Sequence, residues 1–318
     1  MRELTRLVLL LLATTFVTVS CKDKSPNGRT DTYSSGAIEF ASDESFCPII
    51  DEEVEIFQTI YPQASLTPIY TNELDAVNMV MEEKIWLAIT TRTFTEREIQ
   101  NLKDRRFMPF SIPLAFDGLA LIVNNENPDT IISIHDLQSI LKGEVSEWDS
   151  LYPGSKLGQI EVAFDNKQSS TVHWCVDSLL DGQPINSPNI YAVEKSAEVI
   201  DFVEQHPNSI GIIGSNWLND KRDTTNVTFN KNITVMGVSR LHPATEESSW
   251  KPYQYYLYNG NYPLRRTIYA LLNDPRHGLP WGFTNFISAD FRGQLIMHKA
   301  GLLPYRGNMT VREVIVND

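Results

Sequence analysis

Hydrophobic and polar residues along this chain follow two periods in turn, which predicts strands and helices in alternation. Short apolar runs such as 85–90 (IWLAIT) predict buried strands, and apolar residues spaced three and four apart predict helices. The predicted strands are 37–41, 66–70, 85–90, 112–116, 119–124, 160–164, 210–213 and 266–272. The predicted helices are 47–60, 73–81, 95–103, 133–143, 170–180, 197–205 and two within 281–299. This order predicts an α/β protein with parallel sheets covered by helices on both faces.

Three details sharpen these element predictions. Thr95 and Glu98 have the spacing of a capping box, and Ser133 is placed to cap a helix that stops at Gly143. Asp117-Gly118, between two predicted strands, is interpreted as a turn or hinge.

The first twenty residues have a different pattern. Arg2 and Arg6 precede an apolar run at 7–19, which is shorter than the roughly 20 residues needed to span a bilayer. The run ends at Cys21, and the segment TVSC is similar to the lipobox of bacterial lipoproteins, in which that cysteine is acylated. We therefore predict a signal peptide at 1–20 and a lipidated, flexible tether at 21–36, with a plain secretory signal as the alternative.

Composition narrows the function classes. The 318 residues carry 27 Lys and Arg against 40 Asp and Glu, so the net charge is -13, which argues against binding to nucleic acid. The length predicts two domains. Cys47 and Cys175 are interpreted as separate thiols, with a disulfide between them as the alternative in an exported protein. The six histidines are scattered and no metal-binding motif is present, so we expect neither a metal nor a cofactor.

Small hydroxyl residues occupy three of the predicted strand-to-helix turns. These turns are 42–46, 90–93 and 166–171. In parallel α/β sheets, ligands bind beyond the carboxyl ends of strands, where helix N-termini present free N–H groups. Hydroxyls and N–H groups together suit an oxyanion, although each turn alone is equally explained by N-capping.

Four segments resemble the substrate-binding lipoproteins of phosphate ABC importers, which are type II periplasmic binding proteins. They are 112–128 (IPLAFDGLALIVNNENP), 140–151 (ILKGEVSEWDSL), 209–214 (SIGIIG) and 262–303. The resemblance implies two α/β lobes with a ligand cleft between them. It also implies that the chain crosses near Ala115 and returns near Thr267. The first lobe would then comprise 37–115 and 268–318, and the second lobe 116–267.

The resemblance also implies which residues bind the ligand. The pair Ser45-Phe46 matches the family's Thr-Phe turn, and the family's Ser-Gly-Thr matches Ser169-Ser170-Thr171. Three positions depart from the family. Asp165 stands where the family has arginine, so Lys167 or Arg92 would have to replace that cation. A family serine falls on Glu73, and the family's aspartate falls near Thr91, which Arg92 follows. Pairing of Arg92 with a carboxylate such as Glu96 is the alternative.

The resemblance implies a monomeric, non-enzymatic protein that binds a small tetrahedral oxyanion, phosphate first, and delivers it to ABC permease subunits. We expect the protein to be exported and anchored to a bacterial membrane through Cys21. One alternative is a sensor or interaction module that has lost phosphate specificity. A remote alternative is an exported serine hydrolase that uses Ser169 and His173.

Overall fold

The computed structural model describes residues 29–218 and 229–306. By its contacts, the chain divides into an N-terminal unit that ends at Asp31 and one compact body that begins at Thr32. The predicted signal peptide and Cys21 lie outside the described residues. Thr32 forms a bridge with Ser35, and the first strand begins at Gly36. Among the residues that the structure describes, no helix is long and apolar enough to cross a bilayer.

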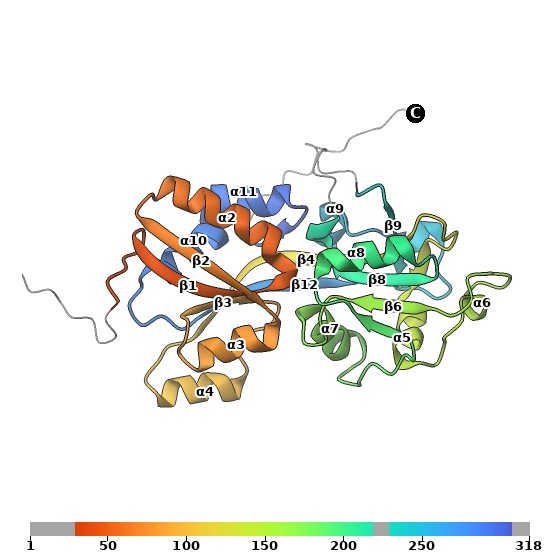
Figure 1. Cartoon of the computed structure of the whole chain (residues 1–318), viewed down its shortest axis with the longest axis horizontal. Helices are drawn as coiled ribbons and strands as arrows, with labels where there is room; N and C mark the ends of the chain where they lie inside the picture. Colours follow the sequence, from red (N-terminus) through yellow and green to blue (C-terminus); the bar gives the residue numbers. More distant parts are fainter. Residues whose placement is uncertain (1–28, 219–228, 307–318) are drawn as a thin grey trace, which may run out of the picture. The chain divides into compact units, whose positions relative to one another are not determined.

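The body is built on one long sheet (Figure 1), in the order β2-β1-β3-β12-β4-β8-β6-β7. At one end, β1 (Gly36–Asp43) lies parallel to β2 (Ala64–Thr71) and β3 (Leu87–Thr90). At the other end, β6 (Glu161–Phe164) lies parallel to β7 (Ile190–Ala192) and β8 (Ser209–Gly214). The two parallel parts are joined by two antiparallel strands, β4 (Phe110–Asn124) and β12 (Arg265–Leu272).

The remaining strands are short. β9 (Ile233–Val235) and β13 (Leu303–Pro304) both pair with β4. A second, three-stranded sheet consists of β5 (Ile131–Ser133), β10 (Gly237–Ser239) and β11 (Ser249–Trp250). In it β5 and β10 are parallel, so their carboxyl ends lie at the same edge.

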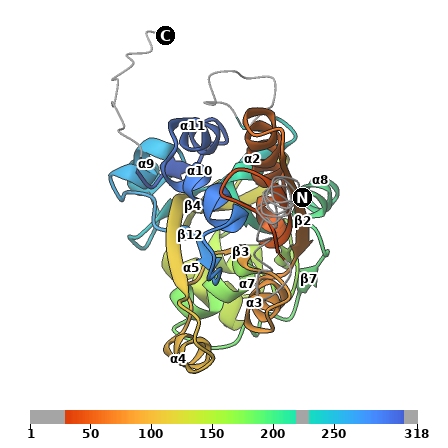
Figure 2. The ribbon, with the colours of Figure 1, turned by 90° about the vertical axis from the view of Figure 1, so that its left-hand side faces the viewer.

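Helices cover both faces of each half of the long sheet (Figures 1 and 2). The first half carries α2 (Cys47–Ile60), α3 (Glu73–Met81), α4 (Glu96–Asp104), α10 (Leu279–Ala289) and α11 (Phe291–Lys299). The second half carries α5 (Ile134–Lys142), α6 (Trp148–Leu151), α7 (Ser170–Trp174), α8 (Ser196–Gln205) and α9 (Gln254–Tyr258). A π-helical turn (Cys175–Leu179) continues α7, and 3-10 turns lie at Glu44–Phe46, Ser215–Trp217 and Glu246–Ser248.

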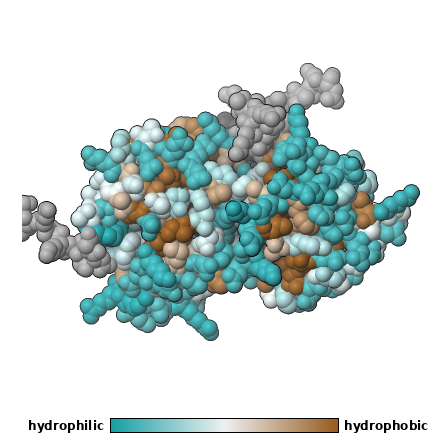
Figure 3. Space-filling view, in the orientation of Figure 1, coloured by the Kyte–Doolittle hydropathy of each residue, from teal (hydrophilic) through white to brown (hydrophobic). Residues whose placement is uncertain are grey.

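Separate hydrophobic clusters fill the two halves. Those of the first half, here called the first lobe, draw on residues 38–115 and 268–302. Those of the second half, the second lobe, draw on residues 119–264 and Leu303. On the face seen in Figure 3, hydrophobic residues form small separate groups among hydrophilic ones. The sheet therefore runs through both lobes, but each lobe packs its own core.

The local signals for helix ends are confirmed. Capping boxes form at Thr95 and at Ser133, and Gly143 ends α5 with a positive φ of 76°. Two element predictions are wrong. The strands predicted at 112–116 and 119–124 are one continuous strand, β4, and Asp117 lies inside it and not in a turn. The helix predicted at 170–180 changes to a π-helical turn after Trp174.

Candidate functional site

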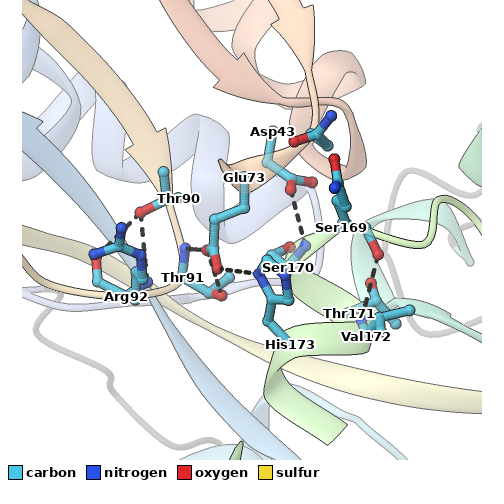
Figure 4. A network of polar contacts seen from close by, with 12 residues as sticks. Asp43, Glu73, Thr90, Thr91, Arg92, Ser169, Ser170, Thr171, Val172 and His173 are labelled. Carbon is cyan, nitrogen blue, oxygen red and sulfur yellow. Dashed lines mark hydrogen bonds and ion pairs between the residues drawn. The ribbon is translucent and has the colours of Figure 1, made fainter. Parts of the chain in front are cut away.

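The predicted turns 42–46 and 166–171 meet between the lobes, where backbone and side-chain groups of one contact those of the other. Ser45 Oγ donates to Asp165 Oδ2 at 3.0 Å, and Ser170 N–H donates to Asp43 Oδ2 at 3.0 Å. The third turn, 90–93, joins them through Glu73, which contacts Thr91 on one side and His173 on the other (Figure 4). Because these groups come from the carboxyl ends of β1, β3 and β6, the sheet topology itself brings them together.

Asp43, the last residue of β1, is the acceptor at the centre of this cluster. Its carboxylate caps the following 3-10 turn by accepting the N–H of Ser45 at 2.9 Å, and it also accepts the Ser45 hydroxyl. Its side chain is 1% exposed. Burial, and then the charge of Asp165, raise the pKa of Asp43 to about 6. Asp43 therefore takes the backbone donor that opens α7.

Asp165 accepts the hydroxyls that were expected to bind the ligand. Ser169 Oγ donates to Asp165 Oδ1 at 2.6 Å, and Thr171 Oγ1 lies 3.4 Å from Oδ2. The third hydroxyl is that of Ser45. Asp165 is 2% exposed. Where the resembled family has arginine, this chain thus has a buried carboxylate that accepts the hydrogen bonds of the neighbouring hydroxyls. Lys167, one candidate replacement for that arginine, is exposed.

Glu73 forms the contact between α3 and α7. It is 1% exposed and accepts hydrogen bonds from Thr91 N–H at 2.8 Å and Thr91 Oγ1 at 3.0 Å, while His173 Nδ1 lies 3.2 Å from Oε1. Burial alone would raise the pKa of Glu73, but the hydrogen bonds from His173 and Thr91 lower it. The hydrogen bond to Glu73 raises the pKa of His173.

Arg92 lies apart from this cluster. Its guanidinium donates twice to Glu98, at 2.8 Å each, and once to the carbonyl of Thr93 at 3.0 Å. Arg92 thus pairs with a carboxylate, as the alternative interpretation had it, and the partner is Glu98, the capping-box residue of α4, in place of Glu96. The guanidinium of Arg92 thus binds the capping-box glutamate at the start of α4. The cation that lies beside the cluster is a different residue.

That cation is Arg266 of β12, which sequence reasoning missed. Arg266 Nε donates to Asp117 Oδ2 at 2.8 Å, both side chains are 0% exposed, and the two residues are register partners of β12 and β4. Arg266 Nη1 donates to Ser170 Oγ at 3.0 Å, with Thr171 Oγ1 at 3.4 Å. The available sequence signal is an arginine at the start of the strand predicted at 266–272, but nothing local indicates its partner.

Phe46 and the second oxygen of Asp117 complete the surroundings of Arg266. The Phe46 ring is buried, with the guanidinium carbon 5.2 Å from its centroid. Asp117 Oδ1 accepts the N–H of Ser215 at 3.0 Å and its hydroxyl at 2.8 Å. Arg266 Nη2 is buried with no hydrogen-bond partner among the described residues. The ion pair thus fixes the two crossing strands directly beneath the cluster.

Further contacts hold the lobes together around the 3-10 turn after β1. The carbonyl of Ser45 accepts Asn216 Nδ2 at 2.9 Å and Trp217 Nε1 at 2.8 Å. Glu44 accepts the N–H and the hydroxyl of Ser196 at 3.0 and 2.9 Å. The cleft is therefore closed over the cluster.

A cavity of about 230 Å³ remains beside the closed cluster. Its lining is strongly acidic, with four carboxylates and one ammonium group: Asp43, Glu44, Asp165, Glu194 and Lys195. Tyr70, Thr71, Asn72, Asn166 and Ser169 complete the wall. The site thus combines many hydrogen-bond donors with an excess of negative charge.

The hydrolase alternative fails on geometry. A serine hydrolase would need Ser169 to donate its hydroxyl proton to His173. Instead, Ser169 Oγ donates to Asp165, and His173 Nδ1 faces Glu73. Cys175 is a buried free thiol, which confirms that the two cysteines are separate, and burial raises its pKa to about 12. Such a thiol is unreactive near neutral pH.

Two lobes are joined by two crossing strands (Figure 1), and their polar loops contact each other through Ser45–Asp165 and Ser170–Asp43. This arrangement defines a type II periplasmic binding protein. Residues 27–290 match the family described as the PBP superfamily domain, and the chain belongs to that family. Members of this class bind solutes and are not enzymes, and this chain is a non-enzymatic member.

Relatives and solved structures agree with this assignment. The phosphate-binding protein PstS of Borreliella burgdorferi is 21% identical over 93% of this chain and 97% of its own length. A Clostridium perfringens structure with bound phosphate, solved as a phosphate ABC transporter substrate-binding protein, has a TM-score of 0.69 at 19% identity, covering 85% of this chain and 100% of that one. An ABC-type phosphate transport receptor from Vibrio cholerae has a TM-score of 0.64 at 19% identity, with the same coverage. The family, the fold and the two-lobed architecture predicted from the sequence are confirmed.

Proposed function

We propose that this chain is the extracytoplasmic solute-binding component of an ABC importer, anchored to a bacterial membrane through an acylated Cys21. Its ligand is a small tetrahedral oxyanion, and phosphate is the leading candidate. The ligand enters between the first lobe (37–115 and 268–318) and the second (116–267), and the closed form is presented to the permease subunits. The family, and relatives named for phosphate binding, support this proposal.

One observation carries the ligand class: hydrogen-bond donors from both lobes converge on the carboxylates of Asp43 and Asp165. Ser45 contributes an N–H and a hydroxyl from the first lobe, and Ser170 contributes an N–H from the second. The hydroxyls of Ser169 and Thr171 and the guanidinium of Arg266 lie beside them. A convergent set of neutral donors with one guanidinium is the arrangement that an oxyanion requires.

In the closed cleft these donors serve the carboxylates of Asp43 and Asp165. An entering oxyanion must therefore displace these two carboxylates from the donors. While both carboxylates are charged, they would repel a dianion bound beside them strongly. Protonation of Asp43, whose pKa is raised to about 6, would remove one charge and create a donor. We therefore expect binding to strengthen as the pH falls.

The same carboxylates support a second candidate, a binding module that has lost phosphate specificity. The hydroxyls of Ser45, Ser169 and Thr171, which were expected to bind phosphate, donate within the protein, and the neighbouring cavity is lined by four carboxylates. Under this alternative the cluster closes the cleft by itself, and the cavity takes a ligand that is not a small anion.

Isothermal titration separates the two candidates. Phosphate, sulfate and molybdate are titrated into the whole chain at about pH 5 and about pH 8. Saturable phosphate binding that is tighter at the lower pH supports the transport proposal. Absence of binding for all three anions at both pH values overturns it in favour of the second candidate.

Anchoring and delivery need separate tests. Labelled palmitate should be incorporated by the chain and not by a Cys21→Ala variant; equal labelling of both overturns the anchor. Uptake of labelled phosphate by cells should fall when the chain is deleted and recover when it is restored. Unchanged uptake contradicts delivery to an importer.

A further inference from the structure

Two histidines and an aspartate, distant in the sequence, meet on the second lobe at the edge of the small sheet. β5 and β10 are parallel there, with Ser133 and Ser239 as register partners. His135 and Asp136 follow β5 by two and three residues, in the first turn of α5, and His242 follows β10 by three residues. These residues belong to the β5–β10 edge, and none of them contributes to the cleft cluster.

The donor atoms of the three side chains have the spacing of metal ligands. Asp136 Oδ1 lies 3.3 Å from His242 Nδ1 and 3.7 Å from His135 Nδ1. One ligand atom from each residue lies within 4.8 Å of the other two. Zinc binds nitrogen and carboxylate oxygen at about 2.0–2.1 Å, so tetrahedral geometry puts donor atoms roughly 3.3 Å apart. The distance between Asp136 and His242 equals that value, and the distance between Asp136 and His135 exceeds it by 0.4 Å.

The carboxylate is oriented by its second oxygen. Asp136 Oδ2 accepts the hydroxyl of Ser133 at 2.6 Å, with the Ser133 N–H at 3.4 Å, as part of the capping box of α5. Oδ1 is consequently left to face the two imidazoles. Such hydrogen bonds to the oxygen that does not bind metal are the usual support of a ligating carboxylate.

A plain hydrogen-bonded cluster explains only part of this geometry. His242 Nδ1 lies within hydrogen-bond distance of Asp136 and also 3.2 Å from Ser133 Oγ. His135 is not held by a hydrogen bond to Asp136, because 3.7 Å is too long for one, and its side chain is 65% exposed. Its ring nevertheless lies 4.4 Å from that of His242. A shared ion accounts for both positions.

We propose that His135, Asp136 and His242 form a binding site for a first-row divalent transition metal, with Zn²⁺ as its representative. Two imidazoles and one carboxylate suit this class, whereas Mg²⁺ and Ca²⁺ prefer oxygen ligands only. The exposure of both histidines, at 65% and 49%, leaves a fourth position open to water. The bound ion links the start of α5 to the segment after β10, two segments about 100 residues apart in the chain.

The test is titration of Zn²⁺ into the chelator-treated whole chain carrying Cys21→Ser, a substitution that removes the thiol at position 21 as a competing ligand. We expect saturation at one ion per chain, and at least a tenfold loss of affinity in His135→Ala and in His242→Ala. His277→Ala removes an exposed histidine elsewhere and is the matched control, with unchanged affinity. Mg²⁺ should produce no binding heat.

A second measurement guards against misfolded variants. Zn²⁺ should raise the melting temperature of the parent and of His277→Ala, but not of His242→Ala, whose melting temperature without metal stays at the parent value. Lack of saturable binding by the parent overturns the proposal. So does an affinity that survives either His135→Ala or His242→Ala.

Discussion

Asp43 Oδ2 accepts the backbone N–H of Ser170 at 3.0 Å, so a carboxylate of the first lobe occupies the first free donor of α7 in the second lobe. An oxyanion ligand would need this donor. The chain thus carries an internal anion at the point where the lobes meet, and its charge should control both closure and ligand affinity.

Replacing Asp43 by Asn tests that control. The amide oxygen can still accept hydrogen bonds, but the buried negative charge is lost, so phosphate affinity should rise by about tenfold or more at about pH 8. Titration calorimetry measures the change. Asp201→Asn, an exposed position on α8, should leave the affinity as it was. A variant that binds phosphate no better than the parent would contradict the role given to Asp43.

Thermal stability should fall as the pH rises from about 5 to about 8. His173 has a raised pKa, so its pairing with Glu73 is fully present below the ordinary histidine pKa and is lost as the pH passes the raised value. Asp43, raised from 3.8 to about 6, binds its proton more tightly in the folded chain, so its contribution is lost between those values. Both groups therefore act in the same direction.

Single variants separate the two contributions to this pH dependence. His173→Gln should flatten the upper part of the melting curve against pH, and Asp43→Asn the lower part, by about 2 °C or more each. Scanning calorimetry at several pH values gives the curves. If His173→Gln keeps the full dependence of the parent, the pair with Glu73 does not titrate in this range.

Arg266→Met should destabilise the protein by about 3–5 kcal/mol, because Asp117 would be left charged and without its partner in the interior. Urea denaturation measures the free energy of unfolding. The double variant Arg266→Met with Asp117→Asn should recover part of the loss, since no buried charge remains. A loss below about 1 kcal/mol in the single variant would show that the pair is solvated.

Arg92→Ala should change phosphate affinity by less than about twofold, since the guanidinium is held by Glu98. If Arg92 replaced the missing family arginine, as the resemblance allows, the same variant would instead lose affinity sharply. The stability cost should be about 1 kcal/mol or less, as for other partly exposed ion pairs. Arg266→Lys, which keeps a charge but loses the planar fork, is the comparison and should weaken binding strongly.

Much of this protein could be predicted from the sequence because it is decided over a few residues. The period of the hydrophobic positions and the capping residues define helices such as α4 and α5 and the strands around them. Because helices begin at the ends of parallel strands, Ser45, Ser169 and Thr91 all reach one cleft. The resemblance of short segments added the two-lobed fold, which the family match confirms.

Only the tertiary structure decided which charges meet. Arg266 and Asp117 are register partners of strands separated by about 150 residues, and His242 reaches Asp136 because β5 and β10 are neighbours. A local pattern records whether a residue faces inward, but not which strand will lie beside it. Pairing across a sheet depends on the packing of the whole chain. This packing places Asp43 and Asp165 where their carboxylates accept the hydrogen bonds of the cleft donors.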